Sequence, residues 1–394
     1  MTAAAFVGFT GFTLVMPFLP LYIRQLGVTD IGEIALWTGV TLGISPAIAA
    51  LTAPLWGRVG DRFGNKLLVQ RSLISFIIVM SAMAYVTKAW HLFALRAIQG
   101  FFAGYGPLTL SMAALSAPRE KMALAIGTVQ TAQRMGPALG PVIGGLLAPA
   151  VGLRNAFFVA AGFYAMAFVL VTALYKEPPR APRAQGGRRR TPFASILAFE
   201  NFVLIMALLF ALQLVDRSFG PILPLHLGEI GYQPDEVPLI AGILFSVLAF
   251  AGALGNQLSS RLLKRYSPRV VIAWAVLVAA ASLAGLTMAT TAWSMAGAMA
   301  VVGLCVGTSI TTAYAAGGAV IPADVHATAF GFLTGASLIG VAVSPVLSGL
   351  VGARSIRAVF VAGAVMLVVL ALVVRRLMVE RNPPIESAPA VEES

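Results

Sequence analysis

The sequence predicts an all-α membrane protein whose twelve transmembrane helices form two pseudo-symmetric six-helix bundles. Three observations support this prediction: a very apolar composition, twelve apolar stretches of membrane-spanning length, and an internal repeat. Of the 394 residues, 59% are hydrophobic and only 11% are charged, with a mean hydropathy of +0.89. Soluble domains are only about 45–50% apolar. The chain is therefore expected to lie in a lipid bilayer.

The spans follow from length and apolarity, because a transmembrane helix needs about 20 mainly apolar residues. Such stretches lie at residues 3–24, 35–56, 67–87, 91–113, 122–148, 154–175, 200–227, 238–260, 270–289, 292–317, 327–351 and 355–377. Their even number places both termini on one side. Of the 27 Lys and Arg residues, 19 lie in loops on that side, five on the other and three inside spans. Since cytoplasmic loops carry the excess of basic residues, both termini are predicted to be cytoplasmic.

The two halves repeat with a shift of 203 or 204 residues. The segment PFLPLYIRQLG at 17–27 aligns with PILPLHLGEIG at 221–231, and the basic turn after the second span aligns with the turn after the eighth. The repeat predicts bundles at 1–175 and 199–378, a basic cytoplasmic linker at 176–198 and a disordered cytoplasmic tail at 379–394. It also predicts a substrate site between the halves near mid-membrane. The linker is interpreted as a topology signal, with lipid-headgroup or regulatory binding as the alternative.

Ten residues at 57–66, GRVGDRFGNK, join the second and third spans through a basic turn that its glycines allow to bend tightly. This turn is similar to the loop between helices 2 and 3 of the major facilitator superfamily. The match to the family pattern G-x-x-x-D-r-x-G-x-k falls at Gly57, Asp61, Arg62, Gly64 and Lys66. The resemblance implies that these five residues form a cytoplasmic conformational latch.

Two further segments resemble the same family. In HLFALRAIQGFFAG, the residues Leu92, Arg96, Gln99, Gly100 and Ala103 match an element of helix 4, for which the family implies a role of the arginine in proton relay. The fifth span contains GPALGPVIGG, which resembles an element of proton-driven antiporters and comprises Gly136, Pro137, Gly140, Pro141, Gly144 and Gly145.

Glycines four residues apart make a smooth helix face, so Gly140 and Gly144 are expected at the interface between the halves. The opening segment TLVMPFLPLYIRQLGV resembles the first helix of drug-exporting members. The chain departs from the drug:proton branch in one respect, because no acidic residue lies between Met1 and Leu26. The usual first-helix proton carrier is therefore absent.

Charged side chains inside spans are costly and mark functional sites. Asp216 is the sole carboxylate deep in any predicted span, and Gln213, Asp216, Arg217 and Gly220 share one helix face at i, i+3, i+4 and i+7. Burial favours a neutral, protonated carboxyl group, whereas a nearby arginine favours its charged form. We expect Asp216, with Arg96, Arg134 and Arg217, to couple transport to protons. The alternative is a permanent Asp–Arg pair that makes insertion tolerable.

Candidate substrate contacts are aromatic, Met and amide side chains, because promiscuous sites use adaptable Met and flat aromatic surfaces. The alternative is that these residues face lipid or pack against other helices. The candidates are Phe9, Phe12, Met16, Phe101, Tyr105, Gln130, Gln213, Phe219, Phe245 and Tyr314.

Other functions lack their signatures. The chain has no phosphate-binding loop of the type G-x-x-x-x-G-K-[ST], no Cys–His cluster with metal-ligand spacing and a single Cys305. We therefore expect no enzyme activity, no metal and no cofactor, with the proton gradient as the driving force. The net charge of +12 lies in short runs between apolar stretches, which argues against nucleic-acid binding.

The favoured function is a proton-coupled antiporter of the bacterial inner membrane that exports lipophilic small molecules by alternating access. Its expected partners are the lipophilic substrate, protons and membrane lipids, and it is expected to act as a monomer. An exporter of a specific metabolite, siderophore or organic anion is the alternative, and a non-transporting membrane receptor or scaffold is the remote one.

Overall fold

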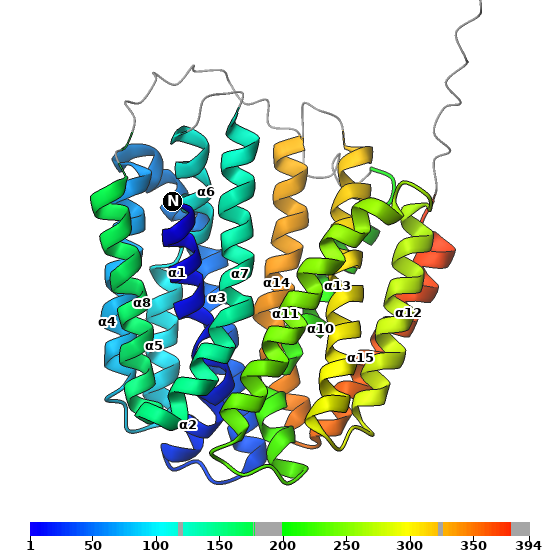
Figure 1. Cartoon of the computed structure of the whole chain (residues 1–394). Helices are drawn as coiled ribbons and strands as arrows, with labels where there is room; N and C mark the ends of the chain where they lie inside the picture. Colours follow the sequence, from blue (N-terminus) through cyan, green and yellow to red (C-terminus); the bar gives the residue numbers. More distant parts are fainter. Residues whose placement is uncertain (117–120, 176, 178–198, 322–325, 380–394) are drawn as a thin grey trace, which may run out of the picture.

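The computed structural model describes residues 1–116, 121–175, 177, 199–321 and 326–379 of the chain (Figure 1). The predicted linker at 176–198 and the predicted tail at 379–394 lie almost entirely outside these residues. Every regular element among the described residues is helical. A bilayer explains this preference, because a helix satisfies its backbone hydrogen bonds within its own segment.

The first half contains shorter helices as well as long ones, because two of its spans are interrupted. Its elements are α1 (Thr2–Thr13), the 3₁₀ turn η1 (Met16–Phe18), α2 (Leu19–Gln25), α3 (Ile31–Phe63), α4 (Asn65–Met83), α5 (Ala89–Phe101), α6 (Tyr105–Ser116), α7 (Met122–Val151) and α8 (Leu153–Leu174). The second half consists of long helices throughout. Its elements are α10 (Phe202–Glu229), α11 (Val237–Leu262), α12 (Pro268–Leu286), α13 (Ala292–Val320), α14 (His326–Gly352) and α15 (Ile356–Leu377).

Two predicted spans were wrong as continuous helices. The first breaks between α1 and α2, where Pro17 and Pro20 each lack the N–H that a helix interior uses. The fourth breaks between α5 and α6, where Gly104 has a φ of 129° that other residues rarely adopt. Both breaks lie within the membrane-spanning part of the chain.

The prediction of twelve spans agrees with the structure. Among the described residues, ten segments are long and apolar enough to cross a membrane, the first comprising α1, η1 and α2 together. The broken pair α5–α6 and the helix α7 supply the other two. α7 is not among those ten segments, and it carries Gln130, Gln133 and Arg134 as well as three prolines.

Corresponding spans pack in the same way in the two halves, as the repeat predicts. α1 packs against α7 as α10 packs against α14, α3 against α5 as α11 against α13, and α4 against α8 as α12 against α15. Each half has its own apolar core: one is drawn from residues 4–175, and the other from residues 202–378 with Ala35. α1 begins and α15 ends at the same end of the bundle, the upper end in Figure 1.

The halves meet mainly through two helix pairs, α3 with α14 and α7 with α11. Glycines allow backbone contact there. A Cβ atom on Gly39 or Gly43 would collide with the carbonyls of Pro345 or Ala342, respectively. All these positions lie toward the α2–α3 connection, the lower end in Figure 1. The halves are therefore sealed against each other at this end of the molecule.

Candidate functional site

The polar face of α10 lines a cavity of about 370 Å³ between the two halves. Gln213, Asp216, Arg217 and Gly220 all contribute to its wall, so the helix face that their spacing defines borders this cavity. Asp216 lies midway along α10, which places the cavity near the middle of the bundle.

Both halves contribute to the cavity, and small or apolar residues dominate the walls that α10 does not supply. The first half contributes Phe9, Thr13, Met16, Gln133, Arg134, Pro137 and Pro141. The second half adds Phe245, Leu248, Ala249, Gly252, Ala253, Asn256, Gly303, Val306, Gly307 and Ile310 from α11 and α13. The cavity thus combines an apolar lining with a few convergent polar groups, as small-molecule sites do.

Asp216 and Arg217 form an ion pair within this cavity. The Oδ2 atom of Asp216 lies 3.2 Å from Nε of Arg217, and the two side chains are 26% and 41% exposed. Solvent therefore reaches both groups even though they lie at mid-bundle. The carboxylate is therefore accessible to solvent and also lies beside a cation of opposite charge.

Arg134 reaches the second half through Asn256, a residue that the sequence analysis did not single out. The amide orientation of Asn256 follows from its hydrogen bonds: its NH₂ group donates to Thr311 Oγ1 (2.8 Å) and to the Gly307 carbonyl (2.9 Å), and its oxygen accepts from Arg134 Nη1. The one signal that would have identified Asn256 is an amide near the end of the apolar span 238–260. This bond connects α7 and α11 on the unsealed side of their contact.

Two glutamines fix the helices around the cavity. Gln213 donates to Ser337 Oγ at 3.0 Å and so joins α10 to α14. Gln133 donates to the Gly106 carbonyl at 3.0 Å and to Thr109 Oγ1 at 2.9 Å, joining α7 to α6. These amide hydrogen bonds fix the relative positions of neighbouring cavity-lining helices within each half.

Arg96 does not join this constellation. Its side chain is only 2% exposed and donates to Gln99 Oε1 at 3.0 Å, within α5. Its backbone carbonyl accepts from Ser45 Oγ at 2.6 Å, so the partners found for Arg96 belong to the first half. In this conformation Arg96 is sealed away from Asp216.

The structure divides the candidate substrate contacts into two groups. Phe9, Met16, Gln213 and Phe245 line the cavity, whereas the other candidates lie elsewhere. Phe12, Phe101 and Gln130 are exposed, Phe219 packs against Phe360 in the second core, Tyr105 donates its hydroxyl to the Ala4 carbonyl, and Tyr314 stacks on Phe330. Residue type alone did not separate the two groups, because each helix has several apolar faces.

The motif on α7 faces in two directions, and the expectation that Gly140 and Gly144 meet the other half was wrong. A Cβ on Gly140 would collide with Thr13, and one on Gly144 with the Leu14 carbonyl, both in the first half; Gly136 likewise lies against Phe9 and Thr10. Gly145 contacts the Pro238 carbonyl of α11 instead, and the Pro141 carbonyl lies against Gly242. The interface between halves therefore uses the face carrying Pro141 and Gly145, and Pro137 points into the cavity.

The predicted latch is only partly described. The backbone of Gly57, Asp61 and Arg62 belongs to α3, and their side chains lie outside the described part of the chain. Gly64 has a φ of 104° and turns the chain into α4. Lys66 donates to the carbonyls of Thr172 and Tyr175 at the end of α8, where a cation interacts favourably with the helix dipole.

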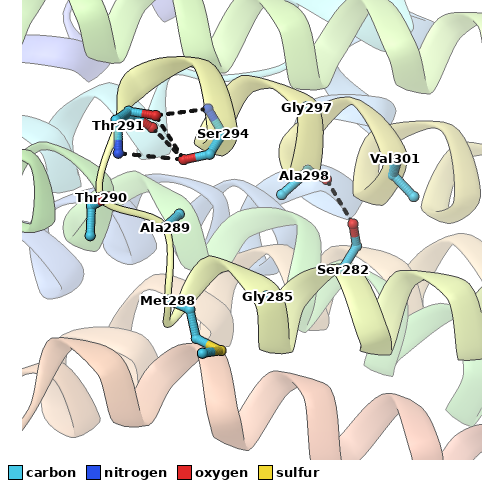
Figure 2. A pocket seen from close by; sticks show the side chains of 10 residues that line it. All are labelled: Ser282, Gly285, Met288, Ala289, Thr290, Thr291, Ser294, Gly297, Ala298 and Val301. Carbon is cyan, nitrogen blue, oxygen red and sulfur yellow. Dashed lines mark hydrogen bonds between the residues drawn. The ribbon is translucent and has the colours of Figure 1, made fainter.

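A second hollow, of about 520 Å³, lies at the turn between α12 and α13 (Figure 2). Its polar groups are occupied locally: Thr291 and Ser294 cap α13 reciprocally, and Ser282 donates to the Ala298 carbonyl at 3.4 Å. It presents no convergent polar groups to a ligand. Among the described residues, no three His, Cys, Asp or Glu side chains lie close enough to hold a metal ion.

The comparison with protein families decides the affiliation. The sequence model of the Major Facilitator Superfamily matches residues 1–233 and 205–394. The chain belongs to the major facilitator superfamily. The resemblance inferred from the turn after the second span and from the motifs of the fourth and fifth spans is thereby confirmed, and the chain is a multi-pass membrane protein.

Two relatives illustrate its position within this superfamily. The multidrug resistance protein MdtG of Serratia proteamaculans is 31% identical over 286 residues, which cover 72% of this chain and 69% of that protein. The multi-drug resistance efflux pump PmrA homolog of Lactococcus lactis is 33% identical over 270 residues, covering 68% of this chain and 66% of that protein.

Solved structures of other superfamily members share the fold. A bacterial homolog of the human lysosomal transporter Spinster, in an inward-facing and unoccupied conformation, superposes with a TM-score of 0.78 at 16% identity, over 96% of both chains. The nucleoside transporter NupG superposes with a TM-score of 0.75 at 16% identity, over 96% of this chain and 98% of that one. At such identities these structures bear on the fold alone.

Proposed function

We propose that this protein is a proton-coupled antiporter that exports lipophilic small molecules by alternating access. The observation that carries the proposal is the cavity between the halves, where apolar walls surround the solvent-accessible pair of Asp216 and Arg217. The names of the efflux relatives support the substrate class. We place the protein in the bacterial inner membrane with both termini cytoplasmic, because most basic residues lie on that side.

With this orientation the structure corresponds to a state that faces the cytoplasm. The sealed end at the α2–α3 connection is then the outer end, and solvent reaches Asp216 from inside. Export requires the seal between α3 and α14 and that between α7 and α11 to open while the inner end closes. The segment from Gly57 to Lys66, at the inner end, is the proposed latch for the outward-open state.

Asp216 is the proposed proton carrier. Protonation from the outer side neutralises the carboxylate, weakens its attraction to Arg217 and releases a neutral or cationic substrate. Deprotonation toward the cytoplasm restores the ion pair and resets the cavity. The residues do this without a metal, a cofactor or a covalent step, so we assign no enzymatic activity to the chain.

The experiment is transport in proteoliposomes with a defined orientation and an imposed proton gradient. A fluorescent lipophilic cation should accumulate against its gradient only while the proton gradient persists, and protons should move in the opposite direction. Accumulation that survives a protonophore contradicts proton coupling. Absence of counterflow with every substrate tested contradicts transport and favours the receptor or scaffold hypothesis.

A second candidate is an exporter of a specific organic anion. Two arginines, Arg134 and Arg217, face the cavity together with a single carboxylate, Asp216, so the site carries an excess of positive charge. Competition in the same assay separates the candidates: inhibition by small carboxylates or siderophore-like anions, and not by lipophilic cations, favours this second function.

A further inference from the structure

An apolar groove runs along the outer face of the second half, at the contact of α11, α12 and α13. It has a volume of about 420 Å³ and is lined by Leu258, Leu262, Tyr266, Val270, Val271, Trp274, Ala275, Val278, Leu304, Cys305 and Thr308. The hydroxyl of Thr308 is already bonded to the carbonyls of Gly255 (3.0 Å) and Leu304 (2.8 Å). The groove therefore offers a hydrocarbon surface, and it belongs to no part of the central cavity.

The position and length of the groove match one membrane leaflet. Trp274 is 64% and Tyr266 is 54% exposed, so the groove opens outward toward the bilayer. From Val270 to Val278 the helix rises about 12 Å. One leaflet contributes about 15 Å of hydrocarbon. The groove thus accommodates most of one acyl chain that descends from the cytoplasmic end of α12.

The corresponding place in the first half is filled by protein. There the guanidinium of Arg71 lies 3.4 Å from the centre of the Trp56 ring and 5.6 Å from that of Phe102, and it donates to the Phe102 and Ala103 carbonyls at 2.8 and 3.2 Å. This stacked cation closes the space between α3, α4 and the end of α5.

At the equivalent positions of the second half, 203 residues later in the chain, each of these three side chains is a different residue. Trp56 becomes the small, buried Ser259, Phe102 becomes Cys305, and Arg71 becomes Trp274, whose ring is exposed. The repeat that closes its outer cleft in the first half therefore leaves a groove in the second. Two of the three replacements, Trp274 and Cys305, line that groove.

The charges at the mouth of the groove differ between the halves in the same manner. The first turn contains Arg58, Asp61, Arg62 and Lys66, whereas the same shift places Arg261, Lys264, Arg265 and Arg269 in the second. The single acid of the first turn is thus replaced by a lysine. Arg269 donates to the Arg375 carbonyl at the end of α15. Within the described residues, no carboxylate pairs with Arg261, Lys264 or Arg265.

We propose that this groove binds an anionic phospholipid. One acyl chain lies along α12 between Tyr266 and Val278, and the phosphate headgroup lies on Arg261, Lys264 and Arg265 at the cytoplasmic surface. The apolar lining and the unpaired cations lie at the same end of the second half. An anionic lipid of the cytoplasmic leaflet complements both, because it has an acyl chain for the lining and a negative headgroup for the cations.

Quenching of Trp274 by lipids with brominated acyl chains tests the proposal. The purified protein is placed in phosphatidylcholine nanodiscs that contain a small fraction of brominated phosphatidylglycerol or brominated phosphatidylcholine. The Trp274 signal is the difference between the parent and Trp274→Phe. Each of the three cations should strengthen the binding of an anionic lipid by about fivefold. Phosphatidylglycerol should therefore be preferred over phosphatidylcholine by about a hundredfold. Trp293, which is 88% exposed at the start of α13, is the matched control and should be quenched equally by both lipids.

Three variants separate the two parts of the site. Replacing Arg261, Lys264 and Arg265 together by Gln should abolish the preference for phosphatidylglycerol. The single substitution Lys264→Asp, which restores the charge pattern of the first half, should already reduce that preference. Cys305→Phe should protect Trp274 from both lipids. Arg376→Gln, which removes a basic residue of α15 that does not line the groove, should change nothing. Equal quenching of Trp274 by both lipids in the parent, or a preference that survives Lys264→Asp and the triple variant, would overturn the proposal.

Discussion

Arg96 in the first half and the Asp216–Arg217 pair in the second half are intramembrane charges held in opposite ways. In the first half, Arg96 is 2% exposed and bonded to Gln99, whereas in the second the side chains of Asp216 and Arg217 are 26% and 41% exposed in the cavity. A group that exchanges protons must meet water, and of these three groups only Asp216 and Arg217 meet that condition in this conformation. Under the proposed function, the seventh span therefore carries the candidate proton acceptor, in a chain whose first span has no acidic residue.

The largest expected effect comes from Asp216→Asn, which keeps the shape of the cavity and removes the proton-accepting group. Uphill efflux should fall to background, while passive exchange of substrate remains measurable, because asparagine imitates the protonated form. Glu33→Gln is the matched control at an exposed carboxylate outside the cavity and should transport normally. Uphill transport by the Asp216 variant would reduce this residue to a structural partner of an arginine.

Gly145→Leu should have the next largest effect, because its side chain collides with α11 at the outer seal. We expect the closed end to open and transport to fall by at least about tenfold, the equivalent of about 1.4 kcal/mol. The measurement is labelling of a cysteine introduced at Met16 in a Cys305→Ser background, with a reagent applied from outside.

Gly144→Leu is the matched control for this helix, because its collision is with Leu14 inside the first half. It should lower the melting temperature without raising outside labelling. Identical behaviour of the two variants would contradict the division of α7 into an internal face and an interface face.

Arg96→Met tests the sealed side of the comparison. Removing the guanidinium leaves the Gln99 oxygen without its donor, which costs about 1–3 kcal/mol in a buried site. We therefore expect a lower melting temperature and reduced transport, with an unchanged ratio of protons to substrate. An altered ratio at an unchanged melting temperature would instead show that Arg96 joins the proton relay in another conformation.

The smallest effect is expected from Asn256→Ala, which removes one hydrogen bond between the halves. A hydrogen bond to a charged group contributes about 1.5–3 kcal/mol when buried, and less here because Arg134 borders a solvent-reached cavity. We expect a few-fold increase in the substrate KM with proton coupling intact. Asn256→Asp should bind Arg134 more strongly and slow the cycle, and identical kinetics of all three proteins would show that the bond has no role.

Much of the fold followed from the sequence because bilayers restrict the choices of a chain. Apolar length determined the positions of the spans, and the repeat determined which pairs of spans pack alike. The breaks at Pro17 and Gly104 were missed as interruptions, since apolar length is the same for a broken helix as for a straight one.

The site was predicted in part, and the reason differs between residues. Four polar or small residues on α10 share one helix face, and it is the polar face of that span. Exposing this face to lipid would be energetically costly, so the sequence predicted that it points toward the cavity. The aromatic candidates had no such constraint: Phe245 lines the cavity while Phe219 packs in the core, although both are phenylalanines in apolar spans. Asn256 was missed because no charged residue inside its span shares its helix face, whereas Gln213 shares its face with Asp216 and Arg217.

By itself the sequence determined the membrane location of the spans, the family resemblance and the charged face of α10, because each depends on composition or on spacing along one helix. The tertiary structure decided which face of α7 meets α1 and which meets α11, that Arg96 is sealed, and that Arg134 reaches Asn256. Those outcomes depend on the rotation of each helix about its axis. That rotation is set by close contacts between residues distant in the chain, which spacing along one helix does not encode.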